Sequence, residues 1–156
     1  MNIKLLVMDV DGTLTDGRIY MGADGELMKA FDVRDGYAIA HMLPSLGIIP
    51  VIITGRSSAI VAQRAKELNI SELYQGITDK PAMLLKVSAK FNVPTSEVAY
   101  IGDDLNDLEC IRLCGYSACP ADAVPDVLSA VDYVCQHAGG RGAVREFIDH
   151  LSHIVH

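Results

Sequence analysis

The chain has 156 residues, of which 50% are hydrophobic and 21% charged, and its formal net charge is −7. This composition excludes a disordered or collagen-like chain, and the length suits a single domain over residues 1–156. The acidic balance argues against a nucleic-acid or membrane-surface partner, and no apolar run approaches the roughly 18 residues of a membrane span. The amino-terminal stretch lacks a long apolar region with a small-residue cleavage site, which predicts a cytoplasmic protein.

Short apolar runs that are followed by a polar residue or a glycine predict the buried strands of a parallel sheet. These runs are Ile3–Met8, Ile48–Ile53 and Val98–Ile101, and the shorter candidate strands are Leu73–Gln75, Tyr116–Cys119 and Asp132–Val134. Helical patterns lie between and after them, over Gly36–Leu46, Ser57–Leu68, Pro81–Phe91, Leu105–Leu113 and Gly142–Leu151. Strands that alternate with helices predict right-handed crossovers and an α/β fold with a doubly wound, mostly parallel, Rossmann-like sheet.

One segment breaks this alternation. Two short stretches flank Asp24-Gly25, a favoured turn pair, so residues 18–33 predict a β-hairpin flap that follows the first strand. Two further residues are expected to set helix ends: Pro44 should kink or end the first helix, and Ser57 should cap the second.

The polar residues at the carboxyl ends of the apolar strands form the candidate site, because ligands bind there in doubly wound sheets. Asp9 and Asp11 follow the first strand, Thr54 the second and Asp103 a later one, while Lys80 opens a helix between them. Converging carboxylates cannot all ionise without a compensating charge, and an all-oxygen set selects a hard cation, most simply Mg²⁺. A cation, a hydroxyl and a lysine together predict a site for a phosphoryl group.

Four segments in order resemble the motifs of the haloacid dehalogenase superfamily of aspartate-dependent phosphotransferases. They are Asp9-Val-Asp11-Gly-Thr13, Thr54-Gly-Arg56, Lys80 and Gly102-Asp103-Asp104-Leu-Asn-Asp107. Further segments resemble a subgroup that acts on phosphate esters of eight- and nine-carbon sugar acids, among them Thr15-Asp16-Gly17, Lys29-Ala-Phe31 and Gly139-Gly-Arg141-Gly. The 42 residues between Asp11 and Thr54, and the 25 between Thr54 and Lys80, leave no space for the cap domains of larger relatives.

The resemblance implies a Mg²⁺-dependent phosphomonoesterase that works through an aspartyl-phosphate. Asp9 is implied as the nucleophile, and Asp11 as the acid that protonates the departing sugar oxygen and then the base that activates water. The implied metal ligands are Asp9, Asp103 and the backbone carbonyl of Asp11.

The same resemblance implies how the phosphoryl group is held. Thr54 and the backbone N–H of Gly55 are expected to bind phosphoryl oxygens, and Lys80 to offset the repulsion between the two reacting anions. Asp104 or Asp107 is expected to orient metal-bound waters or Lys80.

Arginines are the natural partners for the carboxylate of a sugar acid, because their planar fork matches its two oxygens. Arg56, Arg64 and Arg141 are the candidates for this contact. The subgroup consists of small homotetramers, which implies a homotetramer here. Because the chain has no cap, we expect a hairpin or carboxyl-terminal segment of a neighbouring subunit to complete each active site.

Other functions stay open at this point. The substrate of a phosphatase would be an eight-carbon sugar-acid phosphate or a nine-carbon, sialic-acid-type 9-phosphate. A receiver module shares the acidic pair, hydroxyl and lysine, but its phosphate-accepting aspartate should end a middle strand, where Thr54 stands. A non-catalytic assembly domain would not need the intact set of Asp9, Asp11, Lys80 and Asp103, and a phosphomutase usually needs a cap to exclude water.

Overall fold

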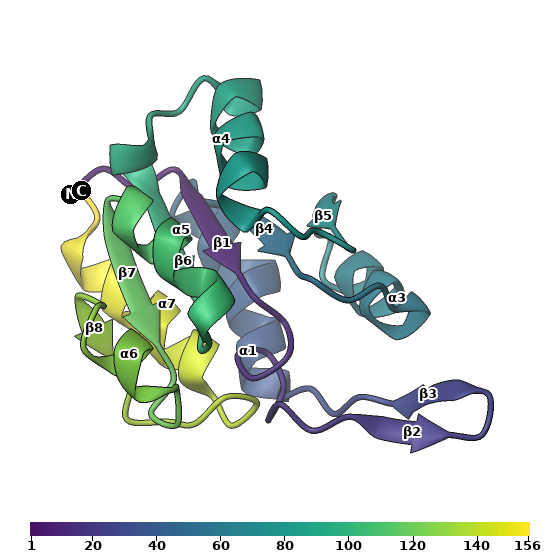
Figure 1. The fold of residues 1–156 in the computed structure, drawn as a ribbon. Coiled ribbons are helices and arrows are strands. Elements are labelled where there is room, and N and C mark those ends of the chain that lie inside the picture. Colours follow the sequence, from purple (N-terminus) through teal and green to yellow (C-terminus); the bar gives the residue numbers. More distant parts are fainter.

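The computed structural model describes residues 1–156 and has a six-stranded parallel sheet at its centre (Figure 1). The order across the sheet is β5-β4-β1-β6-β7-β8, so the chain moves outward from β1 first to one side and then to the other. This confirms the doubly wound α/β fold. The strands are β1 (Leu5–Met8), β4 (Ile49–Ile53), β5 (Glu72–Tyr74), β6 (Val98–Ile101), β7 (Tyr116–Cys119) and β8 (Tyr133–Val134).

Two helical layers cover the sheet, one on each face (Figure 1). The first layer holds α1 (Val33–Tyr37), η1 (Ala38–Met42), α2 (Leu43–Ser45), α3 (Ala59–Glu67) and α7 (Ala143–Ile154). The second holds α4 (Lys80–Phe91), α5 (Leu108–Leu113) and α6 (Pro125–Leu128), with the short 3₁₀ turns η2 (Thr95–Glu97) and η3 (Leu105–Asp107) in the connections. None of these helices is long and apolar enough to cross a membrane.

Strand β1 shows why the sheet strands read as unbroken apolar runs. Its four residues are fully buried, and alternate side chains enter different cores. Leu6 and Met8 pack under the first helical layer, whereas Leu5 and Val7 pack under the second. Helices cover both faces of a parallel strand, so the side chains on both faces are buried and apolar.

The predicted first helix is continuous but irregular. Its central part, η1, is a π-helix in which the N–H of Leu43 donates to the carbonyl of Ala38, five residues back. Pro44 has no N–H and its ring would collide with a carbonyl of the preceding turn, so the helix widens before it and ends at Ser45. The expected effect of Pro44 is therefore confirmed.

Helix α3 begins one residue later than the sequence predicts. Its cap is Ser58 rather than Ser57, because Ser58 has the extended backbone of a cap and its Oγ accepts a hydrogen bond from the N–H of Val61 at 3.3 Å. Two adjacent serines cannot be told apart by a capping pattern, since only the backbone conformation decides which of them caps the helix.

The predicted hairpin is present as an antiparallel pair, β2 (Tyr20–Gly22) and β3 (Gly25–Met28), and it projects from the body of the molecule (Figure 1). Its turn is one residue earlier than expected, because Gly22 pairs with Gly25 and leaves Ala23-Asp24 as the turn. Between β1 and β4 the chain therefore holds only this hairpin and the first helix, as the motif spacing predicts.

The first turn of α1 contains a buried carboxylate, Asp35, whose Oδ1 accepts the N–H of Arg145 at 2.9 Å while Oδ2 has no partner. Burial raises the pKa of Asp35 to about 6, and the N–H of Arg145 only partly opposes this shift. Since the folded state holds this proton more tightly than the unfolded state, the site stabilises the fold most below about pH 4. The contribution is lost as the pH rises through about 6.

Asp35→Asn is therefore expected to gain about 3 kcal/mol of stability over the wild type at pH 8, and only about 1 kcal/mol at pH 4.5. The asparagine keeps an oxygen for the N–H of Arg145 but carries no charge. Urea unfolding at the two pH values measures the difference, with Asp24→Asn at the exposed hairpin turn as a control. Equal pH dependence in the wild type and Asp35→Asn would contradict the prediction.

Candidate active site

The candidate site lies at the carboxyl ends of β1 and β6, the two central strands of the sheet. Asp9 follows β1 directly, and its N–H donates to the carbonyl of Ile101 at 3.1 Å, which extends the pairing of the two strands by one residue. Asp103 stands two residues beyond the end of β6. The chain leaves β1 toward one side of the sheet and reaches β6 on the other side, so this edge is where the strand order reverses.

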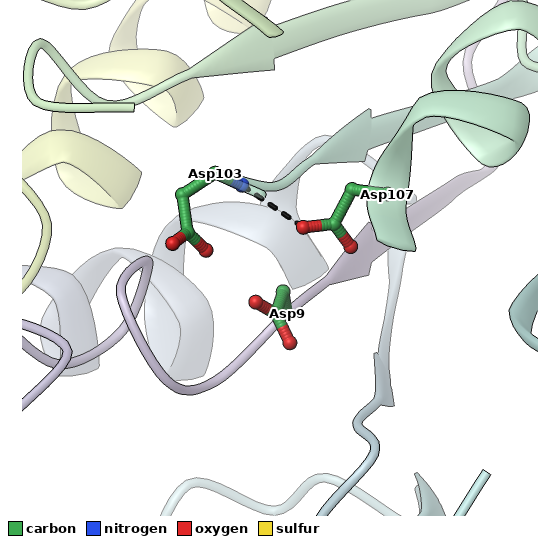
Figure 2. Close-up of side chains that lie close together, drawn as sticks. All are labelled: Asp9, Asp103 and Asp107. Carbon is green, nitrogen blue, oxygen red and sulfur yellow. Dashed lines mark hydrogen bonds between the residues drawn. The ribbon is translucent and has the colours of Figure 1, made fainter. Parts of the chain in front are cut away.

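Three carboxylates meet at this edge. Asp9, Asp103 and Asp107 each offer one oxygen, and these atoms lie within 4.8 Å of one another (Figure 2). Burial and the charge of Asp107 raise the pKa of Asp9, although Lys80 opposes the shift. Burial and the neighbouring Asp9 carboxylate raise the pKa of Asp103 to about 9. The cluster therefore holds more negative charge than its own cation compensates, as expected of residues that take up a further cation.

Lys80 supplies the one positive charge inside this cluster. Its Nζ donates to Oδ1 of Asp9 at 2.9 Å and to Oδ1 of Asp107 at 2.8 Å, and its side chain is only 1% exposed. Burial by itself would lower the pKa of Lys80, but the charges of the two carboxylates outweigh it and raise the pKa above its ordinary value. Asp79 caps α4 through the N–H of Ala82 and so holds the first turn that carries Lys80.

Asp107 has no free acceptor position. Its Oδ1 accepts from Lys80 and from the hydroxyl of Tyr100 at 2.5 Å, and its Oδ2 accepts the backbone N–H groups of Asp103 and Asp104 at 3.0 and 3.1 Å. A side chain at Gly102 would put its Cβ 2.4 Å from Cγ of Asp107, which explains the glycine there. Asp107 therefore orients Lys80 and the loop after β6, and Asp9 and Asp103 are the better placed ligands.

Asp104 does not share this environment. It is exposed and caps η3, where its side chain accepts the N–H of Leu105 at 2.7 Å. Of the two residues expected to orient metal-bound waters or Lys80, only Asp107 contacts Lys80.

The turn after Asp9 is shaped around Asp103. The hydroxyl of Thr13 donates to Oδ1 of Asp103 at 2.9 Å, and a Cβ at Gly12 would lie 2.0 Å from Oδ2 of Asp103. Gly12 also has a φ of +94°, which favours glycine. The carboxylate oxygens at this edge are the ligands that Mg²⁺ prefers, so the donor set fits a hard divalent cation.

The Asp11 side chain has a partner of its own. Its carboxylate is not part of the acidic cluster but accepts a hydrogen bond from Nζ of Lys29 at 2.5 Å, and Lys29 comes from the hairpin. Burial would lower the pKa of Lys29, but hydrogen bonds to Asp11 and Glu26 outweigh it and raise the pKa. If Asp11 contributes to a metal site, it therefore does so through its backbone carbonyl, as the resemblance implies.

Thr54 directly follows β4 on the same edge of the sheet and is buried. Its N–H donates to the carbonyl of Tyr74, and its carbonyl accepts the N–H of Ile77, so the loop after β5 fixes its backbone. The next two residues, Gly55 and Arg56, are exposed, and the guanidinium of Arg56 lies 3.8 Å from Glu26 of the hairpin.

The structure does not bring Arg64 into contact with the acidic cluster. Its guanidinium bonds Glu67 at 3.2 Å, lies over the ring of Phe31 and occupies the space that a Cβ at Gly36 would take. It thus lines the groove between α1 and α3 on the first helical face.

Arg141 is exposed on a loop that packs against the Asp9–Thr13 turn. Gly140 donates its N–H to the carbonyl of Thr13 at 3.1 Å, and a Cβ at Gly139 would lie 2.0 Å from the carbonyl oxygen of Gly12. The glycines of this loop are therefore explained by close backbone contact.

Sequence reasoning missed three residues of this site: Lys29, Tyr100 and Thr13 as a partner of Asp103. Lys29 and Thr13 both stand in segments that carry the family resemblance, which is the signal that could have found them. Tyr100 reads as one more apolar residue of a buried strand, and nothing in the pattern shows that its hydroxyl meets Asp107.

The chain matches the family model of haloacid dehalogenase-like hydrolases over residues 66–148. It is 48% identical over 150 residues to the 3-deoxy-D-manno-octulosonate 8-phosphate phosphatase of Escherichia coli K12, an alignment that covers 96% of this chain and 79% of the relative. The corresponding phosphatase of Yersinia pestis is 47% identical over 148 residues, with 95% and 79% covered.

Solved structures give the same result. The phosphatase from Moraxella catarrhalis, in complex with a magnesium ion, a phosphate ion and a KDO molecule, has a TM-score of 0.94 and 43% identity, with 98% of this chain and 87% of that chain covered. The cobalt-bound phosphatase from Haemophilus influenzae has a TM-score of 0.92 and 39% identity, with 97% and 88% covered.

Proposed function

The chain belongs to the haloacid dehalogenase-like hydrolases and is a phosphomonoesterase, and we propose that its substrate is 3-deoxy-D-manno-octulosonate 8-phosphate, hydrolysed with Mg²⁺ bound. The observation that carries the proposal is the meeting of Asp9, Asp103 and Lys80 at one edge of the sheet. The names of relatives at 47–48% identity support the substrate. The magnesium, phosphate and KDO in a structure that is 43% identical support both the metal and the substrate.

We assign the metal to Asp9, Asp103 and the backbone carbonyl of Asp11. The buried carboxylate of Asp9 and the half-buried carboxylate of Asp103, whose pKa values are both raised, form an oxygen-only donor set that fits a hard divalent cation. When bound, Mg²⁺ would offset the charge of these carboxylates and of the phosphoryl oxygens.

The protein side chains then carry the two steps. One carboxylate oxygen of Asp9 attacks the phosphorus, the bond from phosphorus to the sugar oxygen breaks, and that oxygen takes the proton of Asp11. A water then attacks the phosphorus of the aspartyl-phosphate, gives its proton to Asp11, and the bond between Asp9 and phosphorus breaks to release inorganic phosphate. Lys80, held between Asp9 and Asp107, would stabilise the negative charge that the reaction concentrates next to Asp9.

Substrate contacts come from the loop after β4. Thr54 and the N–H of Gly55 are assigned to phosphoryl oxygens, and the exposed guanidinium of Arg56 to the sugar-acid carboxylate. Arg141 remains a candidate for the same carboxylate. A nine-carbon sugar-acid phosphate is the alternative substrate, since it presents the same two anionic groups.

A homotetramer in the cytoplasm remains the predicted state of the protein. The hairpin supports an interface between subunits, because Met21 and Leu27 are 62% and 68% exposed on it. Apolar side chains that gather on a projecting element are typical of a contact surface.

The test of the proposed function is a kcat/KM panel of eight- and nine-carbon sugar-acid phosphates and simple sugar phosphates, run with Mg²⁺ and after chelation. We expect the eight-carbon sugar-acid phosphate to give the highest value, and chelation to abolish turnover until Mg²⁺ is restored. Equal values across the panel would contradict the substrate, and full activity after chelation would contradict the metal.

A further inference from the structure

The burial pattern of the hairpin is inverted at Lys29. The side chain of Lys29 is only 2% exposed, whereas Leu27 and Met28, the two residues before it, are 68% and 48% exposed. Burying an ammonium group costs several kcal/mol unless charged partners compensate it, while exposing leucine and methionine forfeits apolar burial. Leu27 and Met28 remain available for the proposed subunit contact, whereas Lys29 is buried within its own chain between two carboxylates, those of Asp11 and Glu26.

The partners of Lys29 connect the hairpin with the reacting groups. Its Nζ donates to Oδ1 of Asp11 at 2.5 Å and lies 3.0 Å from Oε2 of Glu26 on β3. Glu26 in turn accepts the hydroxyl of Ser58, the cap of α3. The guanidinium of Arg56 lies 3.8 Å from the same glutamate. The contact of Lys29 with Asp11 thus connects the end of the hairpin to the loop after β1, and the contact of Glu26 with Arg56 connects it to the loop after β4.

We propose that Lys29 is a positioning residue for the reaction: together with Glu26, it holds the carboxylate of Asp11 in the orientation from which Asp11 exchanges protons with the leaving oxygen and the attacking water. The inference rests on the proposed function, because the role of Asp11 is itself part of it. It also assigns the hairpin of the same chain to its own active site, in addition to any contact with a neighbouring subunit. A carboxylate with no such partner would rotate freely about its side-chain bonds, and misplacement of a reacting group by about 1 Å costs on the order of 10²-fold in rate.

Lys29→Met tests this with two substrates, because methionine keeps the length of the side chain and removes its charge. With the sugar-acid phosphate, we expect kcat to fall roughly 10- to 100-fold and KM to change less than about threefold. With p-nitrophenyl phosphate, the aryloxide leaves without a proton, so formation of the aspartyl-phosphate should keep its rate in Lys29→Met. Hydrolysis of the aspartyl-phosphate should be slower, because it still needs Asp11 as the base that activates water. The expected signature is a burst of one p-nitrophenolate for each active site, followed by slow turnover.

Three further variants complete the test. Lys29→Arg should restore most of the activity, and Glu26→Gln should give a smaller loss in kcat even if Lys29→Met folds poorly. Lys66→Met removes the same charge from an exposed position on α3 and should behave as the wild type. The inference would be overturned if the kcat of Lys29→Met with the sugar-acid phosphate were within threefold of that of Lys66→Met. It would also be overturned if Lys29→Met gave neither a p-nitrophenolate burst nor steady-state turnover of p-nitrophenyl phosphate. A wild type that hydrolyses no phosphate ester would instead overturn the proposed function.

Discussion

Asp9→Asn is expected to abolish turnover of every phosphate monoester while the chain stays folded. The substitution replaces the attacking oxygen with an amide of almost the same volume, so the nucleophile is lost and the surroundings remain. Folding should not suffer in the metal-free protein. Because burial and Asp107 raise the pKa of Asp9, the folded state already disfavours its charge, and a neutral side chain relieves that cost.

The measurement is steady-state phosphate release by Asp9→Asn with Mg²⁺ present, together with urea unfolding in its absence. Asp126→Asn makes the same change at an exposed position on α6 and should retain full activity. Residual turnover by Asp9→Asn within about 10-fold of the wild type would show that another group attacks the phosphorus. A 10-fold loss corresponds to a rise of only about 1.4 kcal/mol in the activation barrier, and loss of a covalent nucleophile should raise the barrier by far more.

Lys80→Met is expected to lower both activity and stability. The variant leaves Asp9 and Asp107 facing each other in a buried site without the ammonium that joins them. Removing one partner of a buried ion pair costs about 3–5 kcal/mol in unfolding free energy, because the remaining charge has no compensation. The loss of a charged hydrogen-bond donor beside the reacting oxygens should reduce kcat by about 10²–10³-fold.

Lys86→Met is the matched control, since Lys86 is exposed on the same helix, α4. Urea unfolding of both variants without metal, and kcat with Mg²⁺, separate the two effects. Mg²⁺ should recover part of the lost stability of Lys80→Met, because it brings positive charge to the same carboxylates. A Lys80→Met protein as stable as Lys86→Met would contradict the assigned ion pairs.

The sheet could be predicted from the sequence because its strands are buried on both faces. The apolar run Val98–Ile101 and the shorter candidate Tyr116–Cys119 are strands of the structure with the same bounds. The edge that carries the site follows from the same pattern, since the carboxyl ends of parallel strands lie together. The approach of Asp9, Asp103 and Lys80 was therefore within reach of sequence reasoning.

The details of the site were not within reach, because they depend on where side chains point. No pattern distinguishes Asp107, whose carboxylate is saturated by four donors, from Asp104, which is exposed three residues earlier. Arg64 and Arg56 look equivalent in sequence, yet Arg64 turns into the groove between α1 and α3. The bond from Lys29 to Asp11 depends on how the chain returns from the hairpin to the body of the molecule, which local sequence does not specify.

The most direct test of the shared cation site is the location of the ion itself. A crystal grown with Mn²⁺ in place of Mg²⁺ should show its anomalous scattering between the carboxylates of Asp9 and Asp103 and the main-chain carbonyl of Asp11, at a concentration that also supports turnover. An ion bound instead at the exposed carboxylates of Asp104 or Glu109, with the Asp9 edge empty while turnover persists, would contradict the account.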